Sequence, residues 1–527
     1  MNIKLLFFTS TILSTLALNG QTFDTKTLSV NNHKIGLQSN GDFHRSSDLT
    51  QSISEFPNSS GTNCIYAQSL WLGGINQNSE LKLGANVYRQ SGLDFYPGPI
   101  ATTYSTAYDN MYDNVWHLTK DEVETHMANY NTAGYIVPNA IALWPGNGNT
   151  ANGEAQNLAP YADLNNNNFY EPELGEHPLI RGDEALYVIY NDNRAPHTES
   201  GGGIIGAEVH LMLYAYENTG EDHIDNVIYS HYEIYNRSPD NNFDNFYISS
   251  WLDFEIGNGS DDFVGTQTQQ NMIYGYNGSS SDLDYGTNPP AYGFILLNEN
   301  LTHSMLYNND NNPVAGNPTI PADYYNYMIS NWKNGTHLMN LVDSAEIDYI
   351  YPGDSDTTNY ANWSEITDGN APSDRRMLGS THFQNFGPGN KICLDYAAIF
   401  ARDMSLNNVE QVDHLSSIAT SVQNFYYNQY DDCEDISDLA LIEININAIN
   451  SIKITNENQN YTIQLDQALT MDLNINVVDI LGRSISNSIL KQGDKELTIQ
   501  ISPSNKGIYF VNCKNTEINE SVKLLID

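Results

Sequence analysis

The chain has few basic residues. It carries 22 Lys and Arg against 64 Asp and Glu, which gives a formal net charge of −42 over 527 residues. This excess of negative charge repels phosphate backbones and anionic lipid headgroups, so it argues against nucleic-acid binding and membrane-surface binding. Cations are the natural partners of such a chain, although a high negative charge also favours solubility without any ligand.

Cysteines are also scarce. The four are Cys64, Cys393, Cys433 and Cys513, and none lies in a CxxC or Cys/His spacing typical of a metal site. They are too few and too scattered for a disulfide scaffold. After export they can pair in three ways, and the sequence does not choose among them.

Long apolar runs are absent after the first 20 residues. Residues 1–20 hold one cation, Lys4, then the run Leu5-Leu6-Phe7-Phe8 and, at the end, the small residue Gly20. This order predicts a signal peptide that is removed on export. Its apolar part is shorter than the ~20 residues of a membrane span, so we expect a mature chain without a transmembrane segment.

The charge is unevenly distributed along the chain. Residues 21–439 hold 54 acids and 14 bases, whereas residues 440–527 hold 10 acids and 7 bases. Such a step predicts a domain boundary near residue 440. We expect a signal peptide at 1–20, an acidic front domain at 21–430, a linker at 431–445 and a C-terminal domain at 446–527.

The C-terminal domain has the pattern of a small β-sandwich. Leu473, Ile475 and Val477 alternate with asparagines, which is the period of a half-buried strand. Short strands are predicted at 452–455, 461–465, 473–480, 497–501, 507–513 and 522–526. Six or seven strands in fewer than ninety residues favour an immunoglobulin-like sandwich.

Three segments of this domain resemble the type A sorting domain of type IX secretion substrates. They are Val478-Asp479-Ile480-Leu481-Gly482-Arg483, Lys506-Gly507-Ile508-Tyr509-Phe510-Val511 and Val522-Lys523-Leu524-Leu525-Ile526. The resemblance implies recognition by the type IX machinery, passage from the periplasm across the outer membrane, and removal of the tail with attachment or release. The chain departs from the family at the start of the domain, where Ile444-Asn445-Ile446-Asn447 replaces the usual Pro-Asn-Pro.

The front domain is predicted to be mainly β and sandwich-like, with two short helices. A hairpin is expected over 69–87, and further strands at 185–190, 209–216, 227–235, 246–254, 272–276 and 392–400. Thr119 and Glu122 form a capping box that starts a helix to about Met127. A second helix is expected from 407–410 to about Tyr427, with apolar residues at three- and four-residue steps.

The front region also resembles uncharacterised secreted proteins that carry the same tail. The matching pieces are Ser69-Leu70-Trp71-Leu72-Gly73-Gly74, Tyr88-Arg89-Gln90-Ser91-Gly92, Asp94-Phe95-Tyr96-Pro97-Gly98-Pro99, Asn331-Trp332-Lys333-Asn334-Gly335-Thr336 and Ser373-Asp374-Arg375-Arg376. The resemblance implies one continuous module over most of residues 30 to 430, and it implies no mechanism.

The Asn-rich stretch at 163–173 has the spacing of a calcium loop. Calcium takes oxygen ligands, which Asp163, Asn165 and Asn167 offer at positions 1, 3 and 5 of the loop. The further candidate ligands are the backbone carbonyl of Phe169 and the carboxylates of Glu171 and Glu173, with Glu176 within reach, while Asn168 replaces the usual glycine at position 6. The alternative is a plain Asn-rich turn.

A second acidic cluster surrounds a glycine turn at 257–259. It comprises Asp253, Glu255, Asp261 and Asp262. One interpretation is a further calcium site, another is a carboxylate pair for glycoside hydrolysis, and a third is a solvated turn.

Three His/Glu pairs are spaced two residues apart: His197/Glu199, Glu208/His210 and His231/Glu233. Such pairs could bind a metal, but the alternation of side chains along a strand also produces them without function.

No HExxH helix, GxSxG turn or phosphate-binding glycine loop is present. The sequence therefore favours a secreted or surface protein that binds or displays, with calcium as its cofactor and a glycan or protein as its ligand. The alternative is a secreted polysaccharide hydrolase that uses Asp253, Glu255 or their neighbours, so whether the protein catalyses a reaction stays open.

Overall fold

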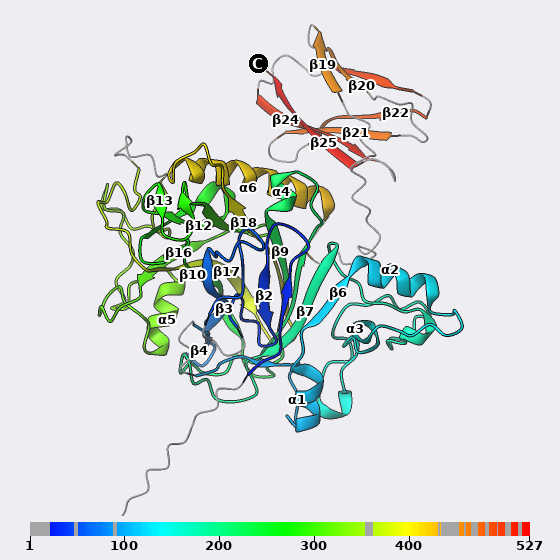
Figure 1. Ribbon diagram of the computed structural model, residues 1–527, viewed down its shortest axis with the longest axis horizontal. Helices are drawn as coiled ribbons and strands as arrows, with labels where there is room; N and C mark the ends of the chain where they lie inside the picture. The colour runs from blue at the N-terminus through cyan, green and yellow to red at the C-terminus, as the bar shows by residue number, and fades with distance from the viewer. Residues whose placement is uncertain are drawn as a thin grey trace, which may run out of the picture.

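The computed structural model describes most of the front region and the strands of the C-terminal domain (Figure 1). The described ranges are 22–46, 51–87, 92–353, 362–430, 433, 453–457, 460–464, 473–479, 484–492, 494–500, 507–514 and 519–526. The predicted signal peptide and, apart from Cys433, the predicted linker lie outside these residues.

Two antiparallel sheets form the front domain. The five-stranded sheet has the order β16 (His303–Asn308), β17 (Arg375–Phe386), β10 (Phe243–Phe254), β3 (Ile65–Asn76) and β4 (Leu81–Gly84). The nine-stranded sheet has the order β11 (Asp262–Gln267), β12 (Met272–Asn277), β15 (Ala291–Leu296), β18 (Lys391–Ala401), β9 (Val227–Asn236), β8 (Ala207–Ala215), β7 (Glu184–Asn191) and β5 (Tyr96–Pro97), with β6 (Trp116–Thr119) also paired to β7. Two short ribbons are β1 (Thr25–Leu28) with β2 (Ile35–Gln38) and β13 (Ser281–Asp282) with β14 (Gly286–Thr287). The mainly β fold class, the hairpin and the strands predicted for this region are confirmed.

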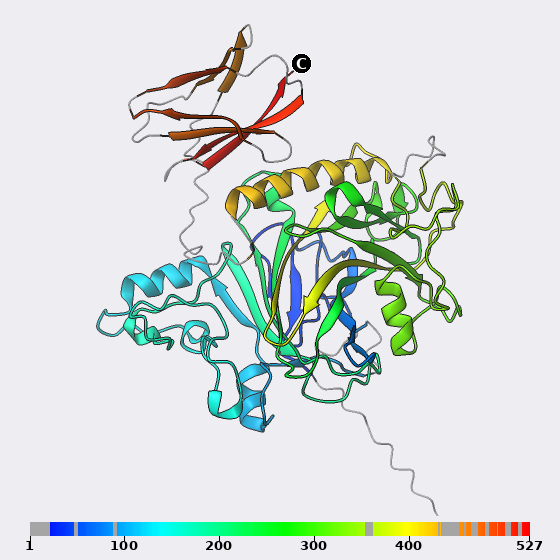
Figure 2. The same cartoon turned by 180° about the vertical axis from the view of Figure 1, so that it is seen from behind.

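The nine-stranded sheet is buried on both faces. In β7, Leu186 and Val188 belong to the core shared with the five-stranded sheet, whereas Tyr187 and Ile189 belong to a second core on the opposite face. This division follows from the two-residue period of a strand. The second core is closed by the long helix α6 (Glu410–Gln429), which lies across this sheet in Figure 2.

The five-stranded sheet is covered on its outer side by α5 (Pro321–Met328). Trp71 of β3 and Trp251 of β10 stack with their ring centroids 6.0 Å apart, and Tyr324 of α5 packs on Trp71 at 5.0 Å. The Trp251 indole N–H donates to the hydroxyl of Tyr307 in β16 at 2.8 Å, so the polar edge of the buried ring is satisfied.

The two predicted helices are confirmed by their caps. In α2 (Lys120–Asn129), the Glu122 N–H donates to the Thr119 hydroxyl and the Thr119 N–H donates to the Glu122 carboxylate, at 3.3 and 3.0 Å. Asn407 and Glu410 exchange equivalent bonds of 3.1 and 2.8 Å ahead of α6. The apolar stripe of α6 is buried as predicted at Val412, Leu415, Ile418 and Val422. Four shorter helices in the described residues were not predicted: α1 (Thr106–Tyr112), α3 (Asn139–Ala142), α4 (Asp222–Asp225) and α5.

A lobe between β5 and β7 projects from the edge of the nine-stranded sheet (Figures 1 and 2). It contains α1, β6, α2, α3 and the 3₁₀ turns η1 (Thr150–Asn152) and η2 (Pro172–Leu174). The Asn-rich stretch lies in this lobe, and its last two residues belong to η2.

The C-terminal domain has two antiparallel sheets, as predicted for a small sandwich. One contains β19 (Lys453–Glu457), β20 (Asn460–Gln464) and β23 (Glu496–Gln500), in that order. The other has the order β22 (Ser484–Leu490), β21 (Leu473–Asp479), β24 (Gly507–Lys514) and β25 (Asn519–Ile526). Leu473, Ile475 and Val477 are buried while Asn474 is exposed, which confirms the predicted alternation.

The end of the front domain is tied down by a disulfide and a buried ion pair. Cys393 in β18 pairs with Cys433, and Cys64 is a buried free thiol. The side chain of Cys513 lies outside the described residues. Arg181 and Asp395 form a fully buried ion pair at 2.9 Å, and Arg181 also donates to the Cys433 carbonyl at 3.0 Å. Because removing one partner of a buried ion pair leaves an uncompensated charge, loss of either side chain should destabilise this end of the front domain.

His197 is a buried imidazolium. Its Nδ1 faces the Leu83 carbonyl at 2.5 Å and its Nε2 faces the Asp192 carbonyl at 2.9 Å, so both nitrogens must donate. Burial alone would lower its pKa, but the bond and charge of Asp192, together with the charge of Asp94, outweigh burial and raise the pKa to about 9.

We expect His197 to make the fold sensitive to alkaline pH. Its folded pKa lies above the unfolded value of about 6.5, so its contribution is complete below pH 6.5 and is lost as the pH rises to about 9. The contribution is on the order of 3 kcal/mol. Urea unfolding from pH 6 to 9 should show a falling free energy for the parent. His197→Gln should be less stable at pH 6 and should change less over this range. Parallel curves for the two proteins would refute this assignment.

Candidate functional sites

The Asn-rich loop turns its polar side chains inward. The Asp163 carboxylate accepts hydrogen bonds from the backbone N–H groups of Asn167 and Asn168, at 3.1 and 2.8 Å. The side-chain amides of Asn165 and Asn167 both face one oxygen of Glu171, at 3.0 and 2.6 Å. Asn168 has φ 60, the left-handed conformation required of the residue at position 6.

Binding of a hard cation here would require both asparagine amides to turn. Their side-chain oxygens accept from the N–H groups of Asn167 and Phe169, at 3.0 and 2.7 Å, so both amides present nitrogen to Glu171. Glu173, in η2, is exposed and does not bond within the loop. Glu176 is fully buried: one of its oxygens accepts from the Glu171 N–H at 2.8 Å, and the other has no hydrogen-bond partner.

The second acidic cluster does not form a cage. The Asp253 carboxylate pairs with Arg376 at 2.9 Å, whereas Asp262 accepts from the Ile256 N–H at 2.9 Å, and both are buried. Burial raises the pKa of Asp262 well above its ordinary value, and the nearby carboxylates of Asp261, Asp282 and Glu255 raise it further. In the part of the chain that the structure describes, Asp253, Glu255, Asp261 and Asp262 do not bring three ligand atoms into one coordination sphere.

Asp253 and Glu255 line a hollow of about 310 Å³ together with Tyr66 and Arg376. Burial raises the pKa of Asp253 to about 7, although Arg376 opposes this shift, and burial also raises the pKa of Glu255. Because Asp253 is a cross-strand neighbour of Arg376 in the β10–β17 pair, its position is explained by an ion pair within the sheet.

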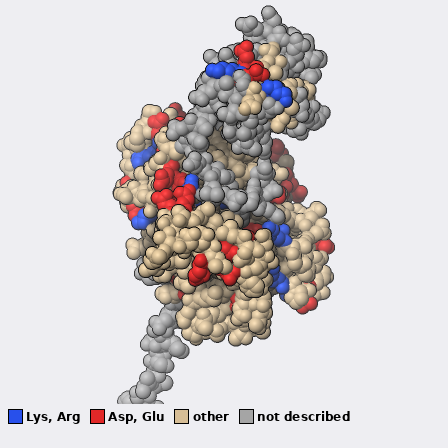
Figure 3. All heavy atoms as spheres, turned by 90° about the vertical axis from the view of Figure 1, so that its right-hand side faces the viewer, with Lys and Arg blue, Asp and Glu red and all other residues tan. Residues whose placement is uncertain are grey.

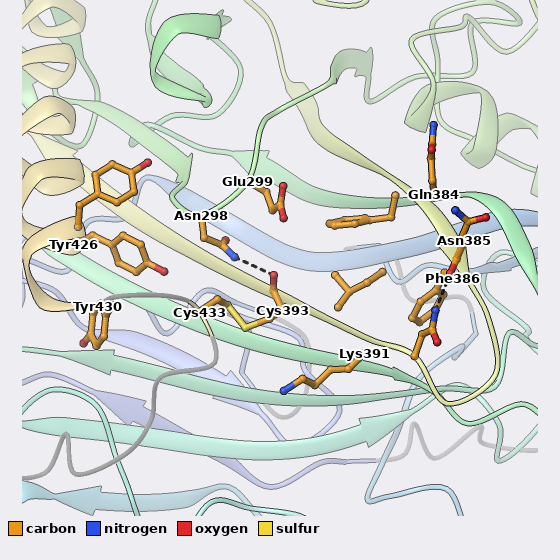
Figure 4. A pocket seen from close by; sticks show the side chains of 14 residues that line it. Asn298, Glu299, Gln384, Asn385, Phe386, Lys391, Cys393, Tyr426, Tyr430 and Cys433 are labelled. Carbon is orange, nitrogen blue, oxygen red and sulfur yellow. Dashed lines mark hydrogen bonds between the residues drawn. A yellow bond between two sulfur atoms is a disulfide. The ribbon is translucent and has the colours of Figure 1, made fainter. Parts of the chain in front are cut away.

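A larger hollow lies at the end of α6 beside β18, with a volume of about 660 Å³ (Figure 4). Its lining combines three tyrosines, four side-chain amides, two opposite charges and the disulfide. These residues are Tyr426, Tyr427, Tyr430, Asn298, Gln384, Asn385, Asn390, Glu299, Lys391, Cys393 and Cys433. Tyr427 is 59% exposed, and its hydroxyl donates to the Leu297 carbonyl at 2.7 Å. No sequence motif marked this hollow, because its residues come from four separate segments.

The three predicted His/Glu pairs serve the fold. His210 bonds Glu208 at 3.1 Å, and the same carboxylate oxygen pairs with Arg237 at 2.8 Å. His231 forms a hydrogen bond with Asp395 at 2.9 Å. Glu233, the other member of that predicted pair, forms an ion pair with Lys391 at 2.8 Å. His197 is the buried imidazolium described above, and Glu199 accepts from the Gly92 N–H at 2.8 Å.

The exposed charge is mostly acidic. On the face shown in Figure 3, Asp and Glu gather in separate patches, with fewer Lys and Arg between them. None of the helices that the structure describes is both long enough and apolar enough to cross a membrane.

Comparison with known proteins identifies the C-terminal domain. A secretion system C-terminal sorting domain matches residues 441–527. No curated protein matches the chain. The match marks the chain for type IX secretion and for the cell surface or the medium, as the sequence resemblance implied. It covers the C-terminal domain alone, so the resemblance proposed for the front region stays a prediction.

Deleting residues 440–527 should retain the protein in the periplasm, because the machinery loses the domain that it recognises. The deletion keeps Cys433 and therefore the disulfide to Cys393. Cell fractionation and immunoblotting of the front domain, in a host with the type IX machinery, would measure the effect. A deleted chain that reached the outside in the parental amount would overturn the assignment, provided that its melting temperature matched that of the parent front domain.

Proposed function

We propose that this protein is a calcium-stabilised module, delivered to the cell surface or released, that binds a glycan through its front domain. The signal peptide, the acidic front domain at 21–430 and the linker at 431–445 are part of this proposal. The observation that carries the binding role is the hollow at the end of α6, which combines the exposed ring of Tyr427 with side-chain amides. Aromatic faces stack on sugar rings, and amides both donate to and accept from sugar hydroxyls.

Calcium binding rests on the Asn-rich loop. Asp163, Asn165, Asn167 and Glu171 turn toward one another within nine residues, which suits an ion that takes several oxygen ligands. Glu176 is buried, and one of its carboxylate oxygens accepts from the Glu171 N–H. Its other oxygen has no hydrogen-bond partner and is a further candidate ligand. The bound ion would rigidify an exposed loop of the lobe.

The calcium proposal predicts a chelator-sensitive fold. With free calcium at a hundredfold excess over Kd, the folded state should gain about 2.7 kcal/mol, which chelation removes. Glu171→Gln should lose most of this gain, because Glu171 faces both asparagine amides. Glu124→Gln is the matched control and should keep it, because Glu124 is exposed on α2 of the same lobe and is not a candidate ligand. Differential scanning calorimetry with calcium or with EDTA measures both. A parent melting temperature that is indifferent to EDTA would refute the proposal.

The glycan proposal predicts that Tyr427→Ala weakens binding. A stacked ring contributes on the order of 1 kcal/mol, so affinity for the best glycan should fall about fivefold. Met404→Ala is the matched control, since Met404 is also 59% exposed and lies outside the lining of the hollow. A glycan array would select the ligand, and isothermal titration calorimetry would compare the variants. Equal loss in both variants, or binding only to proteins, would count against a glycan in this hollow.

The alternative function is polysaccharide hydrolysis at Asp253 and Glu255. It is favoured by one observation: the pKa of about 7 at Asp253 is that of a general acid near neutral pH. The ion pair with Arg376 argues against hydrolysis, because it engages the Asp253 carboxylate within the sheet. New reducing ends released from the selected glycan by the parent and not by Glu255→Gln would support hydrolysis over binding alone.

A further inference from the structure

A group of two histidines and one aspartate lies at the five-stranded sheet, away from the sites above. His303 begins β16, and His337 and Asp348 belong to the segment between α5 and β17. The Nε2 atoms of His303 and His337 face the same oxygen of Asp348, at 3.7 and 3.3 Å. The three residues are separated by 34 and 11 positions in the chain, and no sequence motif connects them.

Each imidazole is oriented by a bond at its other nitrogen. His303 Nδ1 lies 2.8 Å from the Thr302 hydroxyl, and His337 Nδ1 lies 2.7 Å from the side-chain oxygen of Asn331. A proton on Nδ1 of His337 leaves its Nε2 with a lone pair directed toward Asp348. Oxygen partners at the distal nitrogen are the usual second shell of metal-binding histidines.

The backbone also holds the group in place. The Asp348 carbonyl accepts from the Ser304 N–H at 2.8 Å and from the Ser330 hydroxyl at 2.6 Å. The ring of Tyr247 packs edge-on against His303, with a centroid separation of 5.4 Å. His303 and Asp348 therefore belong to one hydrogen-bonded unit with β16.

We propose that His303, His337 and Asp348 bind a divalent transition metal of the zinc class. Two imidazoles and one carboxylate are a common three-ligand set for such ions, with a fourth position left to water. The three donor atoms lie too far apart to share a single coordination sphere as they stand, so binding requires the imidazoles to close on the ion. Side chains with 17%, 31% and 51% exposure can make this adjustment and admit the ion from solvent.

Zinc titration of the full secreted chain tests the site. The protein would be prepared without a histidine tag, stripped with chelator and held in excess calcium, so that the oxygen-lined loop does not compete. Calorimetry with ZnCl₂ should show one strong site per chain. His303→Gln, His337→Gln and Asp348→Asn should each abolish it, and Asn331→Ala should weaken it about 10- to 100-fold by removing the second-shell bond.

His414→Gln is the matched control. His414 lies in α6, which packs on the nine-stranded sheet, so zinc affinity should stay at the parental value. X-ray absorption of the zinc complex of the parent should show two imidazoles and oxygen ligands, a readout that does not depend on variants folding. Failure of the parent to bind zinc, or unchanged affinity in folded His303→Gln and His337→Gln, would overturn the proposal.

Discussion

Buried arginine–carboxylate pairs are the constraint on which the front domain depends. Cations are few in this chain, yet Arg181, Arg375 and Arg376 are all buried beside Asp395, Glu365 and Asp253 respectively. The pairs of Arg181 and Arg376 join segments that are distant in the sequence, whereas Arg375 and Glu365 are ten residues apart. Arg375 and Arg376 are adjacent in β17 and therefore point to opposite faces, so one dipeptide neutralises carboxylates in two different environments. Removing one partner of a buried pair costs about 3 to 5 kcal/mol, so arrangements of the sheets that separate the partners are disfavoured.

The export function constrains the end of the front domain. The sorting domain matches from residue 441, and Cys433 shortly before it is joined to Cys393 in the nine-stranded sheet. Cys433 is also held through its carbonyl by Arg181, and Tyr430 stacks on the same guanidinium at 4.2 Å. The chain that leaves the front domain is thus anchored to β18, between β15 and β9, instead of to the end of α6 alone. Removal of the tail downstream of this anchor would leave α6 and the second core intact.

Local sequence patterns predicted those features whose causes are local. The Thr119–Glu122 box, the stripe of α6, the alternation of β21 and the strands that were predicted depend on residues close together in the sequence, and all are confirmed. The left-handed backbone conformation of Asn168 was also predictable from the local sequence. The strands β11, β15, β16, β17 and β22 were not predicted.

Features that depend on distant partners were not predictable. Arg376 lies 123 positions after Asp253, and a cluster that looked like paired catalytic or metal-binding acids is divided by that one ion pair. The helix α5 was missed because its short Tyr-rich sequence lacks a capping side chain and forms by covering Trp71.

The two proposed cation sites differ in the chemistry of their donor atoms, and this chemistry determines which cation each site selects. A surface with many carboxylates attracts every cation through long-range charge, and this attraction is screened beyond about 8 to 10 Å at physiological salt. Selectivity must then come from the donor atoms. The Asn-rich loop offers carboxylate, amide and backbone oxygens and no imidazole, which suits calcium and leaves it a poor site for zinc. His303 and His337 offer imidazole nitrogens, to which calcium has little affinity. Because the loop lies in the lobe and the histidines lie at the five-stranded sheet, each site can fill without the other, and only one of them should respond to loss of calcium.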